Sequence, residues 1–146
     1  MRITDAQLKQ IYAHAQETYP YECCGFLLGS FDEGGLVRQV RPATNQNRER
    51  SDRFIISAQE FGQVQFAADD AGLDIIGVYH SHPDWPPIPS QTDLDNAWED
   101  VYYLIASIHE SLPLNTNVWR LVDEGIKRFE WVALKIIDAA AMTNGE

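Results

Sequence analysis

The segment that most constrains the fold is DIIGVYHSH at residues 74–82, which is followed by the proline-rich stretch DWPPIP. Its β-branched and aromatic residues favour a strand, and the prolines cannot continue that strand. Two histidines one residue apart on a strand point to the same face, with Cα atoms about 6.6 Å apart. We therefore expect a central strand that ends at His80 and His82, with both imidazoles within reach of one metal ion.

A carboxylate is needed beside these histidines, because catalytic zinc sites typically combine three His, Asp or Glu ligands with an open position for water. Asp93 is the first candidate. The prolines turn the chain back, and Ser90 is placed to cap a short helix whose first turn contains Asp93. Asp84 and Asp95 compete with it. However, Asp84 lies close to the histidines in a proline-restricted stretch, and Asp95 is turned about 200° from Asp93 on a helix.

Amide hydrolysis also requires a group that moves a proton from water to the leaving nitrogen. Glu22 immediately precedes the apolar run CCGFLLG, where a buried carboxylate costs free energy unless it has a partner such as an activated water. Ser90 lies between the candidate ligands and could donate a hydrogen bond to a tetrahedral oxyanion. Taken singly, these residues also fit structural roles: packed histidines, a helix cap and a surface carboxylate.

The rest of the chain reads as one α/β (α+β) domain over residues 1–137, a mixed, mostly antiparallel sheet flanked by helices, with a flexible tail at 138–146. The pattern predicts helices from Thr4 to about Thr18, from about Phe61 to Gly72 and from Ser90 to about Asp100, a hairpin over 23–40, a polar loop at 42–52, and strands at 54–57, 101–108, 116–122 and 127–137.

Charge and composition exclude several classes of function. The net charge is −11, and no Lys or Arg occurs from residue 54 to residue 119, so this stretch would repel a phosphate backbone and attract a cation. We expect no nucleic-acid partner. The sequence also lacks an apolar segment of membrane-spanning length and a signal peptide, which predicts a cytoplasmic protein without membrane contact. Cys23 and Cys24 are adjacent and are expected to be reduced, buried residues.

The run HSHPDWPPIPSQTD, from His80 to Asp93, together with the upstream ECCGFLLG, resembles the JAMM motif of MPN+ (Mov34/MPN/PAD-1-like) zinc metallopeptidases. The compact chain is similar to their prokaryotic single-domain branch. This resemblance implies a cytidine-deaminase-like JAMM/MPN fold and one Zn²⁺ held by His80, His82 and Asp93. It also implies Glu22 as general acid/base and Ser90 as oxyanion stabiliser.

The same resemblance implies hydrolysis of a peptide or isopeptide bond at the C-terminal Gly-Gly tail of a ubiquitin-like or sulfur-carrier protein. Two other interpretations stay open: a zinc-dependent small-molecule amide hydrolase or deamidase, and a non-catalytic scaffold of the MPN type.

Two surface segments carry a functional and a structural interpretation each. The arginines of the stretch 38–53 could dock an acidic carrier or form local ion pairs on a solvated loop; they are Arg38, Arg41, Arg48, Arg50 and Arg53. Trp85, Pro86 and Pro87 could form a wall of a substrate groove or simply a rigid loop.

Overall fold

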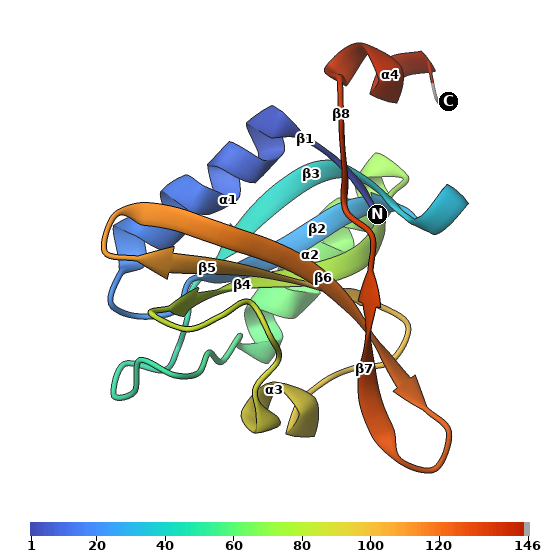
Figure 1. Cartoon of the computed structure of the whole chain (residues 1–146). Coiled ribbons are helices and arrows are strands. Elements are labelled where there is room, and N and C mark those ends of the chain that lie inside the picture. The colour runs from blue at the N-terminus through green and yellow to red at the C-terminus, as the bar shows by residue number, and fades with distance from the viewer. Residues whose placement is uncertain (145–146) are drawn as a thin grey trace.

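The strands form one mixed sheet across the described chain, residues 1–144 of the computed structural model (Figure 1). Their bounds are β1 Arg2–Thr4, β2 Cys24–Ser30, β3 Leu36–Ala43, β4 Asp74–Pro83, β5 Tyr102–His109, β6 Leu112–Asp123, β7 Lys127–Val132 and β8 Lys135–Ile137. The order is β7-β6-β5-β4-β2-β3-β1-β8. The long strands pair antiparallel except β4 with β5, while β1 runs parallel to β3 and β8. The predicted mixed, mostly antiparallel sheet is confirmed.

Helices cover both faces of this sheet. Their bounds are α1 Asp5–Thr18, α2 Ala58–Ala71, α3 Gln91–Asp95 and α4 Ala139–Asn144, with a 3₁₀ turn at Asp32–Gly34. As predicted, α1 begins in a capping box between Thr4 and Gln7, and α2 ends at Gly72 in a left-handed conformation. None of the helices within residues 1–144 has the length and apolar character needed to cross a membrane.

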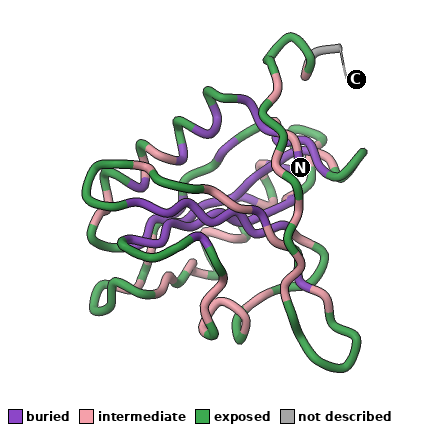
Figure 2. Tube along the Cα trace, in the orientation of Figure 1, coloured by how far each residue is buried: buried purple, intermediate pink, exposed green. Residues whose placement is uncertain are grey.

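The core consists of two apolar layers, one on each side of the central strands. Ile11 and Ala15 of α1 pack against one face, and Val64 and Ala68 of α2 pack against the other. Figure 2 shows buried backbone running through the central strands, and β4 is buried from Ile76 to its end. The strand that carries the histidines therefore ends inside the molecule.

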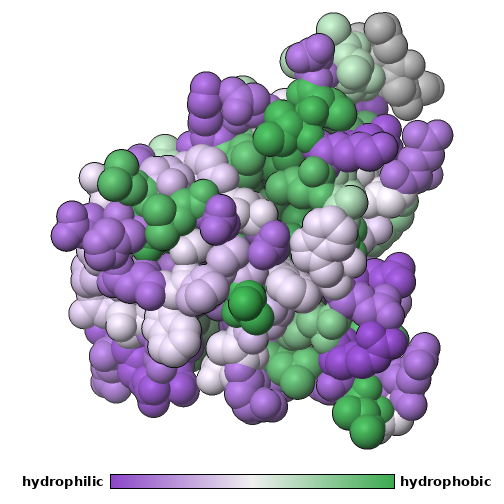
Figure 3. All heavy atoms as spheres, in the orientation of Figure 1, coloured by the Kyte–Doolittle hydropathy of each residue, from purple (hydrophilic) through white to green (hydrophobic). Residues whose placement is uncertain are grey.

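Figure 3 shows hydrophobic residues gathered over β8 and at the tip of the β6–β7 hairpin.

The predicted strand at residues 54–57 is wrong: this segment has no strand pairing and leads directly into the cap of α2 at Ser57. The backbone of Ile55 is bound by the Asn45 side chain and the Gln46 amide instead of by a neighbouring strand. The amide of Ile55 donates to Asn45 Oδ1 at 3.0 Å, and the Ile55 carbonyl accepts from the Gln46 amide at 2.8 Å. The segment FIIS, whose β-branched residues favoured a strand, therefore lies outside the sheet.

Other helices and strands differ from the predictions in where they begin or end. The helix that begins after Ser90 ends at Asp95 rather than near Asp100. The single strand expected at 127–137 is two strands, because the amide of Lys135 donates to the Met1 carbonyl at 2.8 Å and β8 pairs with β1 at the opposite edge of the sheet. Residues 139–144 form α4, and residues 145–146 lie outside the described residues, so the domain at 1–137 and the flexible tail at 138–146 stay predictions.

Candidate metal centre

Three side chains from two elements converge at the end of β4. His80 Nε2 lies 3.1 Å from His82 Nε2, and Asp93 Oδ2 lies 3.3 Å from His80 Nε2 and 3.2 Å from His82 Nε2. All three side chains are buried, each less than about a tenth exposed. The sequence placed these residues together, and the structure does the same.

This cluster fits a tetrahedral metal ion. Ligand atoms at about 2.0–2.1 Å from a zinc ion lie about 3.3 Å from one another in a tetrahedron, which matches the three separations found here. Two imidazole nitrogens and a carboxylate oxygen are also the donor types that zinc prefers. Three Lewis bases at this spacing in a buried pocket are therefore arranged as a metal site.

The first turn of α3 positions Asp93. Ser90 caps the helix: its Oγ accepts from the Asp93 amide at 3.0 Å, and the Ser90 amide donates to Asp93 Oδ2 at 2.8 Å. Asp93 is thus held by the capping box and keeps its Oδ2 near both histidines. In the described structure the Ser90 hydroxyl serves the cap, and the oxyanion role expected for it stays a prediction.

The two competing aspartates point elsewhere. Asp84 accepts hydrogen bonds from Tyr19 Oη at 2.8 Å and from His109 Nδ1 at 2.6 Å, on the surface. Asp95 accepts from Gln91 Nε2 at 2.8 Å on the exposed side of α3. Neither carboxylate contributes to the histidine cluster.

Glu22 reaches the cluster through the pairing of β2 with β4. Cys24 is opposite His80, and Cys23 exchanges hydrogen bonds with Ser81, which continues the register so that Glu22 lies opposite His82. A ligand atom of Glu22 lies within 4.8 Å of ligand atoms of both histidines, so these three residues could also hold an ion. The structure therefore brings the candidate base to the candidate ligands.

The Glu22 carboxyl is buried, with the residue 3% exposed, and its Oε1 has no hydrogen-bond partner among the described residues. Burial raises the pKa of Glu22 to about 9, and the negative charges of Asp93 and Asp52 add to the rise. A nearby cation would favour the charged form instead. An orphaned acidic group beside three metal-type ligands has the chemistry of a proton carrier.

The protonation of the ligands also suits a metal. Burial lowers the pKa of His80, with Asp93 opposing that shift, so His80 stays neutral and its Nε2 lone pair is available. Burial alone would raise the pKa of Asp93, but its hydrogen bonds with His80 and His82 outweigh it and hold that pKa below the usual range. Neutral imidazoles and an ionised carboxylate are the forms that bind divalent metals.

Two cavities flank the cluster and meet at Thr92. One, of about 410 Å³, is lined by Glu22, His82, Ser90 and the exposed residues Trp85 and Ile88. The other, of about 420 Å³, lies beside His80 and Asp93 and is lined mainly by apolar side chains, namely Phe54, Ile55, Ile56, Val78, Trp98 and Tyr103. Trp85 and Pro86 line the first cavity and Pro87 does not, so a wall of a substrate groove stays a prediction. A substrate has room on both sides of the ligands.

Sequence patterns missed two residues that shape the site. The Phe54 ring lies over His80, with ring centroids 4.6 Å apart, although a strand was expected there. Asn45 Nδ2 donates to the Glu22 carbonyl at 3.0 Å, which ties Glu22 to the loop of residues 44–57, here called the arginine loop. Neither position stands out by periodicity or by motif spacing.

Known proteins share this arrangement of sequence and fold. The model of the family described as prokaryotic homologs of the JAB domain matches residues 4–122. The chain belongs to this family. The predicted likeness to JAMM-type metallopeptidases is thereby confirmed, and with it the prediction of an enzyme over that of a non-catalytic scaffold. The chain's Glu22, His80 and His82 form a buried group that could hold a metal ion, as is typical of a JAMM-type site.

Curated relatives align over most of their length. A desampylase from Haloferax volcanii is 36% identical over 102 residues, which cover 66% of this chain and 73% of that protein. A CysO-cysteine peptidase from Mycobacterium tuberculosis is 33% identical over 116 residues, which cover 78% of this chain and 77% of that protein.

Solved structures confirm the fold. A protein from Salinibacter ruber is 36% identical, with a TM-score of 0.72 over 95% of this chain and 93% of that one. A JAB1/MPN domain protein from Archaeoglobus fulgidus is 20% identical, with a TM-score of 0.59 over 94% of this chain and 100% of that one. At that identity the second likeness concerns the fold alone, and the predicted JAMM/MPN fold is confirmed by it.

Proposed function

We propose that this protein is a zinc-dependent peptidase or isopeptidase that hydrolyses the bond at the C-terminal Gly-Gly tail of a ubiquitin-like or sulfur-carrier protein. The observation that carries the proposal is the convergence of His80, His82 and Asp93 beside the unpartnered carboxyl of Glu22. Relatives named CysO-cysteine peptidase and probable TtuB-protein conjugate cleaving protease, the latter from Thermus thermophilus, support a protein tail as substrate.

His80, His82 and Asp93 would hold a single zinc ion. A zinc ion in such a ligand set supplies Lewis acidity toward water and toward a carbonyl group. Glu22 takes a proton from the attacking water and delivers it to the leaving nitrogen: its buried position beside the ligands suits this role, and a bound cation would keep its carboxylate in the charged form that accepts the proton. Ser90, whose Oγ lies at the start of α3, stabilises the oxyanion of the tetrahedral intermediate.

The two cavities support an extended substrate rather than a small amide. An extended tail has parts on both sides of the bond that is cut, and cavities of about 410 and 420 Å³ lie on either side of the ligands. A Gly-Gly terminus has no side chains at the point of closest approach to the buried ligands. A small-molecule amide hydrolase or deamidase, the second candidate, would need only one of these cavities.

The proposal is tested with purified protein and two substrates: a Gly-Gly carrier extended by one cysteine, and the same carrier joined to a lysine side chain. We expect release of the extension, which Glu22→Gln abolishes and which a chelator removes until zinc is restored. Glu17→Gln, on the exposed face of α1, is the matched control and keeps full activity.

Hydrolysis that persists with chelator or in Glu22→Gln would overturn the mechanism. Hydrolysis of free amino-acid amides without cleavage of either carrier substrate would overturn the substrate class and favour the small-amide enzyme. The cytoplasm as site of action and a single protein partner without nucleic acid or membrane stay predictions.

A further inference from the structure

The two histidines are oriented in different ways. His82 Nδ1 lies 2.8 Å from the Pro86 carbonyl oxygen, whereas His80 Nδ1 has no hydrogen-bond partner among the described residues. A carbonyl only accepts, so Nδ1 of His82 carries a proton in this bond, which leaves Nε2, 3.2 Å from Asp93 Oδ2, as the nitrogen that would bind a metal. The loop that supplies the Pro86 carbonyl therefore sets both the tautomer and the ring orientation of His82.

This segment, residues 84–89 and here called the proline loop, is anchored at its start, where the Asp84 amide donates to the Ile108 carbonyl at 2.7 Å. Beyond Asp84, the prolines have no amide hydrogen to donate, and the Ile88 amide donates within the loop, to the Pro86 carbonyl at 2.8 Å. Trp85, Pro86 and Ile88 are exposed, whereas Pro87 is buried. The position of the Pro86 carbonyl relative to the sheet therefore depends on the burial of Pro87 and on hydrogen bonds that the loop carbonyls accept.

The carbonyls on either side of Pro86 accept such bonds from two neighbouring strands. Ser107 on β5 donates its hydroxyl to the Trp85 carbonyl at 2.5 Å, and Trp119 on β6 donates its indole Nε1 to the Pro87 carbonyl at 3.0 Å. Ser107 is 3% exposed. Three consecutive carbonyls thus bind donors from β5, β4 and β6, with His82 in the middle.

We propose that Ser107 and Trp119 are positioning residues for the metal site, because they fix the carbonyls of Trp85 and Pro87 and thereby hold the Pro86 carbonyl against His82. This inference rests on the zinc site proposed above. Groups that orient a metal-binding histidine typically change metal affinity 10- to 100-fold when they are lost. Ser107 and Trp119 act one residue further away, so we expect the lower end of that range.

The first experiment measures zinc affinity by competition with a chelating fluorophore, on the full chain. Ser107→Ala combined with Trp119→Phe should weaken zinc binding about tenfold, whereas Ser107→Thr, which keeps the hydroxyl, should stay within about twofold of the unchanged protein. Trp131→Phe is the matched control. Trp131 is the cross-strand neighbour of Trp119 on β7, and its side chain is 61% exposed. Zinc affinity of the double variant within twofold of the unchanged protein would overturn the proposal.

The second experiment needs no metal and separates this inference from the proposed function. Nitrogen chemical shifts of the metal-free protein at about pH 8, where imidazoles are neutral, report the tautomer of each histidine. His82 Nδ1 should carry a proton in the unchanged protein and in Trp131→Phe, and should share it with Nε2, which faces Asp93, in the double variant, while His14 stays unchanged in all three. A His82 that keeps one tautomer in the double variant would overturn the inference, even if the protein binds zinc and cleaves its substrate.

Discussion

The proline loop and the arginine loop border the same site, yet they are built in opposite ways. The carbonyls of the proline loop accept hydrogen bonds from β4, β5 and β6, so its backbone is fixed to the sheet. The arginine loop is held mainly by its own side chains. Asn45 binds the Ile55 amide and the Arg53 carbonyl, and Asn47 binds the carbonyls of Arg50 and Arg53.

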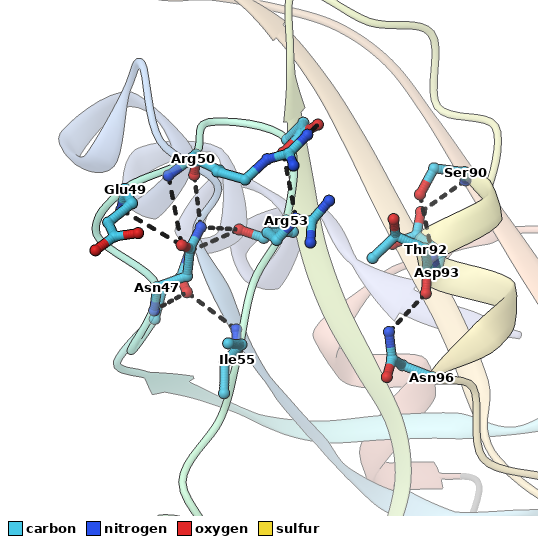
Figure 4. A network of polar contacts seen from close by, with 11 residues as sticks. Asn47, Glu49, Arg50, Arg53, Ile55, Ser90, Thr92, Asp93 and Asn96 are labelled. Atoms are coloured by element: carbon cyan, nitrogen blue, oxygen red, sulfur yellow. Dashed lines mark hydrogen bonds and ion pairs between the residues drawn. The ribbon is translucent and has the colours of Figure 1, made fainter.

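Figure 4 shows the hydrogen bonds within the arginine loop, at Asn47, Arg50 and Arg53, and the contacts of Ser90 and Asp93 at the start of α3. The proline loop, which orients His82, is bound to strands of the sheet. Most hydrogen bonds of the arginine loop, by contrast, are made within the loop itself. The arginine loop contacts the catalytic side at Asn45, which binds the Glu22 carbonyl, and at Phe54, whose ring lies over His80. The metal ligands can therefore keep their geometry while the arginine loop changes its conformation.

The largest effect on zinc affinity is expected at Asp93, the proposed ligand that α3 supplies. Asp93→Ala should weaken zinc binding at least about 100-fold, because a proposed ligand is lost, and the loss of a group that only orients a ligand already costs 10- to 100-fold. Asp95→Ala, two residues away on the exposed side of α3, should leave zinc affinity unchanged. The measurement is the same competition titration. Equal affinities for the two variants would remove Asp93 from the ligand set and leave Glu22, His80 and His82 as the alternative set.

The second prediction concerns the hydrogen bond that Asn45 of the arginine loop donates to the Glu22 carbonyl. Asn45→Ala removes side-chain bonds to the Glu22 carbonyl and to three loop residues, and should lower the free energy of unfolding by about 2–3 kcal/mol and the hydrolysis rate with it. Asn47→Ala breaks bonds within the loop only and should reduce stability by about 1 kcal/mol with little loss of rate. Urea denaturation and steady-state rates check both. Identical rates for the two variants would show that the loop does not position Glu22.

The third prediction uses the buried carboxyl of Glu22 in metal-free protein. Its pKa is about 9 when folded and about 4.5 when unfolded, so the stability of the protonated form is complete below pH 4.5 and is lost as pH rises toward 9. Between pH 7 and 8 the unchanged protein should lose stability relative to Glu22→Gln, by at most about 1.4 kcal/mol per pH unit. The lowered pKa of His80 acts below pH 6.5 and does not interfere in this window.

Urea denaturation of both proteins at pH 7 and pH 8 measures this difference, with Glu17→Gln as a control that should follow the unchanged protein. Parallel pH dependence of the unchanged protein and Glu22→Gln would mean that the Glu22 carboxyl is already ionised at pH 7.

The sequence predicted the fixed side of the site well, because that side depends on short-range rules. Strand alternation placed His80 and His82 on one face, and helix capping at Ser90 placed Asp93 in the first turn. These rules act over a few residues and leave a pattern in the sequence. The same is true of α1, which begins in the capping box that Thr4 and Gln7 predict.

The rest was not predictable in this way, because it depends on contacts between distant residues. Phe54 was placed in a strand, but it stacks on His80, which follows it by 26 positions. Trp119 reaches the proline loop from 32 positions away, and β8 pairs with the N-terminal strand. Such contacts depend on the order of strands in the sheet, which one sequence does not display.

The smallest effect is expected on the surface of the arginine loop, where carrier docking and local ion pairing compete as explanations. Arg50 makes two hydrogen bonds with Asp52, at 2.6 and 2.9 Å, so part of the predicted positive charge is already neutralised on an exposed surface. Arg48 instead lines a cavity of about 500 Å³ beside Glu22. If an acidic carrier docks here, Arg48→Glu with Arg50→Glu should raise KM several-fold at low salt without changing kcat.

Salt and a control variant sharpen this test. The increase in KM should disappear above about 0.5 M salt, because the charges are exposed and screened. Arg41→Glu on β3 makes the same kind of charge change outside the arginine loop, and should alter KM less than the double change does. An unaltered KM in the double variant would assign these arginines to local ion pairing. The loop would then support the site through Asn45 at Glu22 and Phe54 at His80, and the carrier would be recognised by its tail in the two cavities.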